Sequence, residues 1–125
     1  MIGYATLGTN DLARATRFYD ALLGELGAKH MMETERFVVW FVAPDRPALG
    51  LFKPYDGKAA TIGNGTMIAI AMDSPAKVDA MHRKALELGA TDEGAPGPRN
   101  VPGFYAGYFR DLDGNKLNFY CISNS

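Results

Sequence analysis

The sequence predicts an α+β fold built from two successive βαβββ modules. Each half of the 125 residues carries one amphipathic helical pattern flanked by strand-like segments. Both helical patterns end in the same tetrapeptide, at residues 25–28 and 87–90. Because the order of elements around the two tetrapeptides also agrees, internal duplication is the simplest explanation. The fractions of 47% apolar and 22% charged residues are typical of a compact globular domain.

The first module opens with a strand at Ile2–Thr9, in which small, aromatic and branched residues alternate. Asn10 is the predicted N-cap of a helix from about Asp11 to Gly24, with Asp11 close to the positive helix end. Gly27 is the expected C-terminal stop. The apolar face of this helix predicts packing on a sheet; it comprises Leu12, Ala15, Tyr19 and Leu22, with Phe18, Leu23 and Leu26 beside them. Three more strands are predicted at Lys29–Glu33, Arg36–Ala43 and Leu49–Pro54.

The second module repeats this order. A strand at Thr66–Met72 is followed by a helix that Ser74 caps, with Pro75 at its first position and Gly89 after its end. The apolar stripe of this helix consists of Val78, Met81, Ala85 and Leu88. Three strands follow at Ala90–Glu93, Tyr105–Asp111 and Lys116–Ile122, and the last two are joined by a hairpin turn at residues 112–115.

Two glycine-rich segments separate these elements. Residues 56–65 are predicted to link module one, about residues 1–55, to module two, about residues 66–125. Because each half alone is too small for a stable core, residues 1–125 are predicted to form a single domain. Residues Gly94–Gly103 contain three prolines and three glycines and predict a surface loop. This loop is either a flap over a pocket or a stiff connector.

Charge and hydropathy exclude several classes of partner. Thirteen basic and fourteen acidic residues give a net charge of −1, and no run of Lys or Arg could neutralise a phosphate backbone, so nucleic acid is not an expected partner. The apolar run Phe37–Val42 is far shorter than the roughly 20 residues that a membrane helix needs. No secretory signal pattern is visible, and the single cysteine, Cys121, cannot form an internal disulfide. A cytoplasmic protein is therefore expected.

Two motifs relate the chain to a known superfamily. The first is the strand-to-helix start that ends in Asp11-Leu12, followed by Phe18-Tyr19. The second is the hairpin Arg110-Asp111-Leu112-Asp113-Gly114-Asn115. With two βαβββ modules around them, these motifs resemble the vicinal oxygen chelate superfamily of glyoxalases, bleomycin resistance proteins and extradiol dioxygenases. The resemblance covers essentially the whole chain. It implies a curled mixed sheet around a cleft, helices outside the sheet, and a homodimer.

Enzymes of this superfamily hold a divalent metal at four positions, on the first and fourth strands of each module. The matching residues here are Tyr4, Gly50, Met67 and Asn118. Divalent ions want carboxylate oxygen or imidazole nitrogen, and phenol, thioether, amide and glycine offer neither. Moving the Gly50 match to Phe52 changes nothing, because phenylalanine has no donor atom. We therefore expect no metal and no cofactor.

The resemblance also indicates which side chains would line the cleft. Alternation on the last strand places Lys116, Asn118, Tyr120 and Ile122 on one face and Leu117, Phe119 and Cys121 on the other, which suits a helix-packed core. If Asn118 faces the cleft, a small-molecule site is expected to use Tyr4, Thr6, Trp40, Met67, Asn118 and Tyr120. The direction of Trp40 is open, because its strand is hydrophobic on both faces. The alternative is that these residues fill a closed core.

Other candidate groups are explained better as structure. His82 lies on the edge of an apolar helix stripe, and His30 could approach the rim of the cleft. Asp111, Asp113 and Asn115 resemble the start of a calcium loop, but Lys116 occupies the place of its required glycine, so a β-turn with left-handed Gly114 is favoured. Cys121 lacks a neighbouring cation, and nucleophilic catalysis is not expected of it.

The leading functional hypothesis is a metal-independent small-molecule-binding protein, similar to bleomycin-resistance-type sequestering proteins. The alternative is a glyoxalase-like lyase or isomerase that uses Tyr4 or His30 as a proton carrier. The sequence does not identify the ligand.

Overall fold

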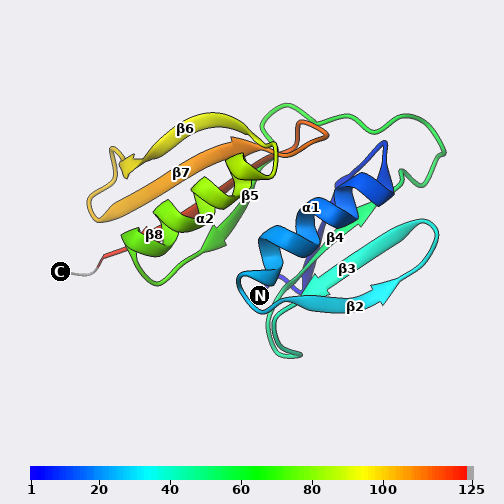
Figure 1. The fold of residues 1–125 in the computed structure, drawn as a ribbon, viewed down its shortest axis with the longest axis horizontal. Coiled ribbons are helices and arrows are strands. Elements are labelled where there is room, and N and C mark those ends of the chain that lie inside the picture. Colours follow the sequence, from blue (N-terminus) through cyan, green and yellow to red (C-terminus); the bar gives the residue numbers. More distant parts are fainter. Residues whose placement is uncertain (124–125) are drawn as a thin grey trace. The chain divides into compact units, whose positions relative to one another are not determined.

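The computed structural model describes residues 1–123, whose helices and strands are labelled in Figure 1. The chain divides into two compact units, Met1–Asn64 (unit 1) and the residues from Gly65 onward (unit 2). The division falls inside the segment 56–65 that the sequence predicts to be a linker. Neither helix within residues 1–123 is long and apolar enough to cross a membrane.

Unit 1 is a four-stranded mixed sheet with one helix against it (Figure 1). Its elements are β1 (Tyr4–Gly8), α1 (Leu12–Gly24), β2 (Lys29–Glu33), β3 (Phe37–Phe41) and β4 (Ala48–Phe52). The strand order is β1-β4-β3-β2; β1 and β4 are parallel, and the other neighbours are antiparallel. The crossover from β1 through α1 is what allows the first and fourth strands to pair in parallel.

The N-cap of helix α1 lies one residue later than predicted. The N-cap is Asp11, whose side chain accepts a hydrogen bond from the Arg14 N–H at 3.0 Å. The expectation for Asn10 is wrong because Asn10 has a distant partner: its Oδ1 accepts from the Ala60 N–H at 2.7 Å. Both residue types make good caps, and the tertiary contact decides between them. The helix then ends as predicted, with Gly27 in the left-handed region at φ 81°.

Unit 2 repeats the arrangement of unit 1. Its elements are β5 (Ile68–Ala71), α2 (Pro75–Glu87), β6 (Thr91–Pro98), β7 (Phe104–Arg110) and β8 (Lys116–Ile122). The strand order β5-β8-β7-β6, with β5 and β8 parallel, is that of unit 1. Ser74 caps α2 by accepting from the Lys77 N–H at 3.1 Å. The predicted α+β fold is confirmed, and each module forms its own four-stranded mixed sheet.

One loop prediction is wrong. The first half of the predicted loop Gly94–Gly103 belongs to β6, which extends to Pro98 and pairs with β7. Proline and glycine are tolerated there because β6 is an edge strand and its pairing is interrupted by register shifts on either side of Gly94. The flap hypothesis is thereby reduced to residues 99–103, which are closed by a hydrogen bond from the Arg99 N–H to the Phe104 carbonyl at 3.0 Å.

The core of each unit lies between its helix and its sheet. In unit 1 the side chains of α1 that are buried are Ala15, Phe18, Tyr19, Leu22 and Leu23. They face alternate residues of the strands, so that Leu51 is fully buried and Trp40 is 2% exposed. In unit 2, Leu117 and Phe119 of β8 are fully buried, and Cys121 is 6% exposed, as the alternation on the last strand predicts. The opposite face of each sheet is not covered by the helix of that unit.

Candidate binding site

The strand register of unit 1 determines which residues lie away from α1. Paired residues share a face, and Thr6 pairs with Gly50, which pairs in turn with Val39. By the same register, Tyr4 and Phe52 lie on this face, which the helix does not cover. Tyr4 is 66% exposed.

A hollow of about 750 Å³ lies on this face of unit 1, within the range of small-molecule sites. We call it the unit 1 hollow. It is lined by Tyr4, Thr6, Leu7, Gly8, Thr34, Arg36, Phe37, Phe52, Lys53, Pro54, Tyr55, Asp56, Ala59, Ala60 and Thr61. One wall is the segment after β4, which approaches β1 closely: a Cβ at Gly8 would stand 2.9 Å from the Cβ of Ala60. Residues predicted as linker thus form part of this wall.

The lining of the hollow includes an aromatic stack. The rings of Phe37 and Phe52 lie nearly parallel, with centroids 4.5 Å apart and an interplanar angle of 9°. Both side chains are half-buried. The stack depends on Gly50, because a Cβ at that position would stand 2.6 Å from Cε1 of Phe52. The ring of Phe52 therefore occupies the space into which a side chain at position 50 would project.

This geometry bears directly on the metal that the superfamily's enzymes hold. Of the four matched positions, Gly50 has no donor atom and its side-chain space is taken by Phe52. Tyr4 offers an exposed phenol, and Met67, just before β5, offers a thioether. The amide of Asn118 offers a hard oxygen donor, but an amide carries no charge. Within residues 1–123 no group of three or more His, Cys, Asp or Glu side chains could hold a metal ion. The matched residues do not fit a divalent ion.

Asn118 occupies an unusual environment on β8 of unit 2. It is 1% exposed, and its Oδ1 is buried without a hydrogen-bond partner among residues 1–123. The strand register places it beside Tyr108 of β7 and Ala69 of β5, on the sheet face away from α2. A buried unsatisfied carbonyl is costly, and it calls for a donor from water or a ligand. Tyr120, two residues further, shares this face and stacks on Phe104 with ring centroids 5.6 Å apart.

Trp40 lies on the other face of the unit 1 sheet from Tyr4 and Thr6. Its ring contacts Tyr19 of α1, with centroids 5.7 Å apart, and its Nε1 donates to Asp20 Oδ1 at 2.9 Å. The sequence leaves its direction open, and the structure turns it toward the helix. It does not line the unit 1 hollow.

The six residues named from the sequence are therefore distributed over both units. Tyr4 and Thr6 come together in the unit 1 hollow, Trp40 lies behind the same sheet, and Met67, Asn118 and Tyr120 belong to unit 2. Sequence reasoning missed Phe37 and the cationic residues of the hollow, Arg36 and Lys53. The alternation of Phe37 with Val39, opposite the Trp40 set, is the signal that could have found Phe37.

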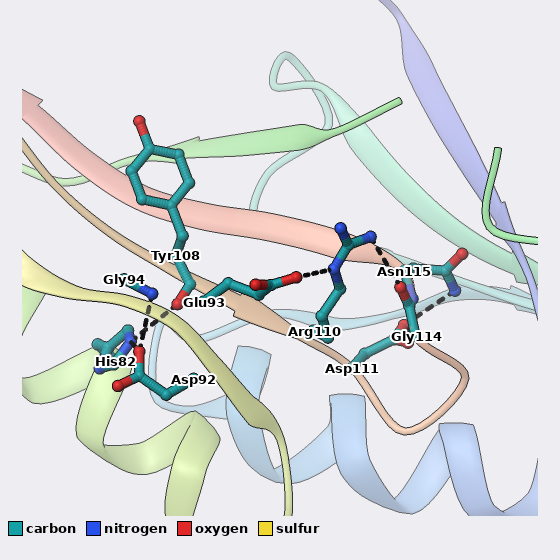
Figure 2. A network of polar contacts seen from close by, with 9 residues as sticks. All are labelled: His82, Asp92, Glu93, Gly94, Tyr108, Arg110, Asp111, Gly114 and Asn115. Atoms are coloured by element: carbon teal, nitrogen blue, oxygen red, sulfur yellow. Dashed lines mark hydrogen bonds and ion pairs between the residues drawn. The ribbon is translucent and has the colours of Figure 1, made fainter. Parts of the chain in front are cut away.

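Neither histidine lies in the hollow. His30 on β2 bonds Asp20 Oδ1 through Nε2 at 2.7 Å, and its Nδ1 lies 3.5 Å from Glu33. The hydrogen bond to Asp20, with a smaller contribution from Glu33, raises the pKa of His30 above its ordinary value of 6.5. His82 on α2 is 4% exposed. Its Nε2 lies 3.0 Å from the Tyr108 carbonyl oxygen and 3.3 Å from Asp92 Oδ1. Figure 2 shows the three residues together.

The C-terminal hairpin of Figure 2 has a structural role. The carboxylate of Asp111 accepts hydrogen bonds from the backbone N–H groups of Asp113 and Asn115, both at 2.9 Å, and from the Asn115 side chain at 3.0 Å. Gly114 adopts φ 88°, the left-handed conformation predicted for it. Arg110 pairs with Glu93 and donates to the Gly114 carbonyl. The acidic motif thus closes a turn.

Two βαβββ units, each with its first and fourth strands parallel and one sheet face left free of its helix, define the vicinal oxygen chelate architecture. The chain matches the family model of the Glyoxalase/Bleomycin resistance protein/Dioxygenase superfamily over residues 1–119. It belongs to this superfamily.

Solved structures agree with this assignment. A glyoxalase/bleomycin resistance protein from Albidiferax ferrireducens T118 is 35% identical, with a TM-score of 0.88 over 98% of this chain and 99% of that chain. Lactoylglutathione lyase from Agrobacterium tumefaciens is 20% identical, with a TM-score of 0.73 over 97% and 92% of the two chains. A fosfomycin resistance protein from Mesorhizobium loti is 19% identical, with a TM-score of 0.70 over 99% and 92%. The last two share the fold alone. A comparison with curated protein sequences found no match.

Proposed function

We propose that this protein binds a small, flat, largely apolar molecule in the unit 1 hollow and sequesters it without a metal. One observation carries the proposal: the Phe52 ring occupies the side-chain space of Gly50 and stacks on Phe37. Where enzymes of the superfamily hold an ion, this chain presents an aromatic surface. Such a surface favours the face of a planar ligand, because stacked rings gain about 0.5–1.5 kcal/mol beyond the burial of their area.

Polar groups around the stack would orient the bound molecule. Tyr4 and Thr6, which both carry a hydroxyl group, belong to the lining of the hollow. In unit 2, the unsatisfied Oδ1 of Asn118 would accept a hydrogen bond from the N–H or O–H of a molecule bound to that unit. A few fixed polar groups in an otherwise apolar lining are typical of small-molecule sites.

A glyoxalase-like lyase or isomerase is the alternative, and one observation favours it: Tyr4 brings a phenol to the hollow. A general acid or base must lie within hydrogen-bond reach of the proton that it transfers. His30 does not meet this requirement in the hollow, because Asp20 holds it on the helix side of the sheet. Conversion of methylglyoxal hemithioacetal by the wild type, lost in Tyr4→Phe, would support the enzyme in place of the sequestering protein.

Metal independence is tested by equilibrium dialysis of the whole protein against 2-naphthalenemethanol, a neutral planar probe. We expect the same dissociation constant in EDTA, in Ni²⁺ and in Zn²⁺. Phe52→Leu removes the stacking ring and should weaken binding by roughly threefold to tenfold. Phe104→Leu removes the ring of the other stack, in unit 2, and should leave binding unchanged. One tightly held divalent ion per chain, with probe binding that disappears on chelation, would contradict the proposal.

The assembly and compartment belong to the same proposal. We propose a homodimer, as the resemblance implies, which light scattering of the eluted protein would detect as twice the mass of 13.6 kDa. The buried thiol of Cys121 suits a reducing compartment such as the cytoplasm.

A further inference from the structure

Three cationic residues of unit 1 line two hollows that share part of their lining. Arg36 and Lys53 line the unit 1 hollow and also a smaller adjoining hollow of about 290 Å³. Lys58 lines the smaller hollow, and no acidic residue does. The one acidic residue in the larger lining is Asp56, whose Oδ1 already accepts from the Lys58 N–H at 2.9 Å. In a chain of net charge −1, this is a local excess of positive charge.

Arg36 is held at this rim in a defined position. Its Nη2 donates to the Pro54 carbonyl oxygen at 2.9 Å, and its own carbonyl accepts from the Lys53 N–H at 2.8 Å. That side-chain bond uses one of five guanidinium N–H groups. The remaining donors form a planar fork that matches a carboxylate. The backbone bond between Arg36 and Lys53 also brings the two cationic residues to the same end of β3 and β4.

We propose that the ligand is a planar aromatic carboxylate, with its ring on the Phe37–Phe52 stack and its anionic group on Arg36 and Lys53. This inference rests on the proposed function, because it places the ligand in the same hollow. The stack selects for a flat ring, and the cations select for charge. A neutral aromatic molecule would meet only the first requirement, and an aromatic cation would be repelled.

Three naphthalene probes of similar size test the sign of the charge: 2-naphthoate, 2-naphthalenemethanol and 2-naphthylmethylammonium. Equilibrium dialysis of the full chain should rank their affinities in that order, with naphthoate roughly tenfold tighter than the alcohol at low salt, in line with charge-assisted hydrogen bonds. Raising the ionic strength should weaken the binding of naphthoate and leave the binding of the alcohol unchanged, because salt screens partly exposed charges. This measurement needs no variant.

Matched charge removals locate the effect. Lys53→Gln should lower the affinity for naphthoate by roughly threefold to tenfold and the affinity for the alcohol by less than about twofold. Arg83→Gln removes one positive charge from an exposed position on α2 of unit 2 and should leave the affinity for both probes unchanged. Arg36→Lys keeps the charge but loses the planar fork, and should weaken naphthoate alone.

The possible failures are distinguishable. If the three probes bind equally, or if the ammonium probe binds most tightly, the anionic ligand is refuted and the aromatic hollow stands. If the preference for naphthoate is independent of salt and survives Lys53→Gln, the assignment of the anionic group to Arg36 and Lys53 is refuted. If no probe binds, or if every probe requires a divalent ion, the proposed function fails and this inference fails with it.

Discussion

Replacing Gly50 by alanine should disturb the aromatic stack without unfolding the protein. The added Cβ would stand 2.6 Å from Phe52 Cε1 and 3.2 Å from Val39 Cγ2. Carbon atoms in favourable contact lie about 3.5–4.0 Å apart, so the Phe52 ring must move by roughly 1 Å. The ring is the free end of a side chain and can swing, whereas β4 is held on both sides by β1 and β3. The expected result is a displaced ring on an intact sheet.

The magnitude follows from two opposing terms. Loss of the stack with Phe37, now at 4.5 Å between centroids, costs about 0.5–1.5 kcal/mol. Alanine recovers about 0.5–1 kcal/mol, since glycine in a strand loses more backbone entropy on folding. The free energy of unfolding should therefore change by no more than about 1 kcal/mol. Affinity for a planar probe has no such compensation, and we expect it to fall by roughly twofold to tenfold, the same stacking energy expressed as a ratio.

The assay pairs urea unfolding with equilibrium dialysis against 2-naphthalenemethanol. Gly24→Ala is the matched control, because a Cβ there meets nothing within 4 Å. The double change Gly50→Ala with Phe52→Leu should weaken binding no more than Phe52→Leu alone, since both act through one ring. Wild-type affinity in Gly50→Ala, or fully additive losses in the double variant, would refute the role assigned to the stack.

Three further predictions concern groups outside the hollow. Asp20→Ala leaves the buried indole N–H of Trp40 without its acceptor and should lower the free energy of unfolding by about 1–3 kcal/mol. Asp20→Asn keeps an oxygen and should lower the free energy of unfolding by less. Equal losses in the two variants would contradict this prediction. Because the folded-state pKa of His30 is raised, its ion pair stabilises the fold below pH 6.5 and that stabilisation disappears as pH rises through the folded pKa. The stability difference between wild type and His30→Gln should accordingly be larger at pH 5.5 than at pH 9, and a difference that grows with pH would exclude the pairing. Asn118→Leu removes a buried unsatisfied oxygen and should keep or raise the melting temperature of the ligand-free protein, whereas a fall of several degrees would show that the amide is satisfied.

Element type was predictable from the sequence because local patterns determine it. The order of helices and strands is confirmed, and Lys29–Glu33 and Lys116–Ile122 have the predicted bounds. Errors arose where a distant residue competes with a local one. Asn10 has the chemistry of an N-cap, but the backbone of Ala60 occupies its side chain. Pro96 and Pro98 have the chemistry of a loop, but an edge position in the sheet tolerates them.

The site was less predictable than the fold, because a strand that is hydrophobic on both faces does not reveal which face a helix will cover. Trp40 lies against Tyr19 of α1, and this contact depends on how the helix packs. The charged rim also depends on tertiary structure. Arg36 and Lys53 are 17 positions apart in the sequence and become neighbours only through the pairing of β3 with β4. Resemblance to a family points to the first and fourth strands and gives no sign of this rim.

The two modules can be compared at their fourth-strand positions. Gly50 of β4 corresponds to Asn118 of β8, and two residues further each strand carries an aromatic residue, Phe52 or Tyr120. Each of these rings stacks on a phenylalanine of the antiparallel neighbour, at 4.5 Å in unit 1 and 5.6 Å in unit 2. An aromatic stack therefore occurs in both units, beside the position that holds an ion in enzymes of the superfamily. Glycine in unit 1 lets the ring lie over the strand and leaves an aromatic floor, whereas asparagine in unit 2 keeps a buried carbonyl. With the same order of elements, unit 1 therefore presents a surface on which a ring could stack, and unit 2 presents a single hydrogen-bond acceptor.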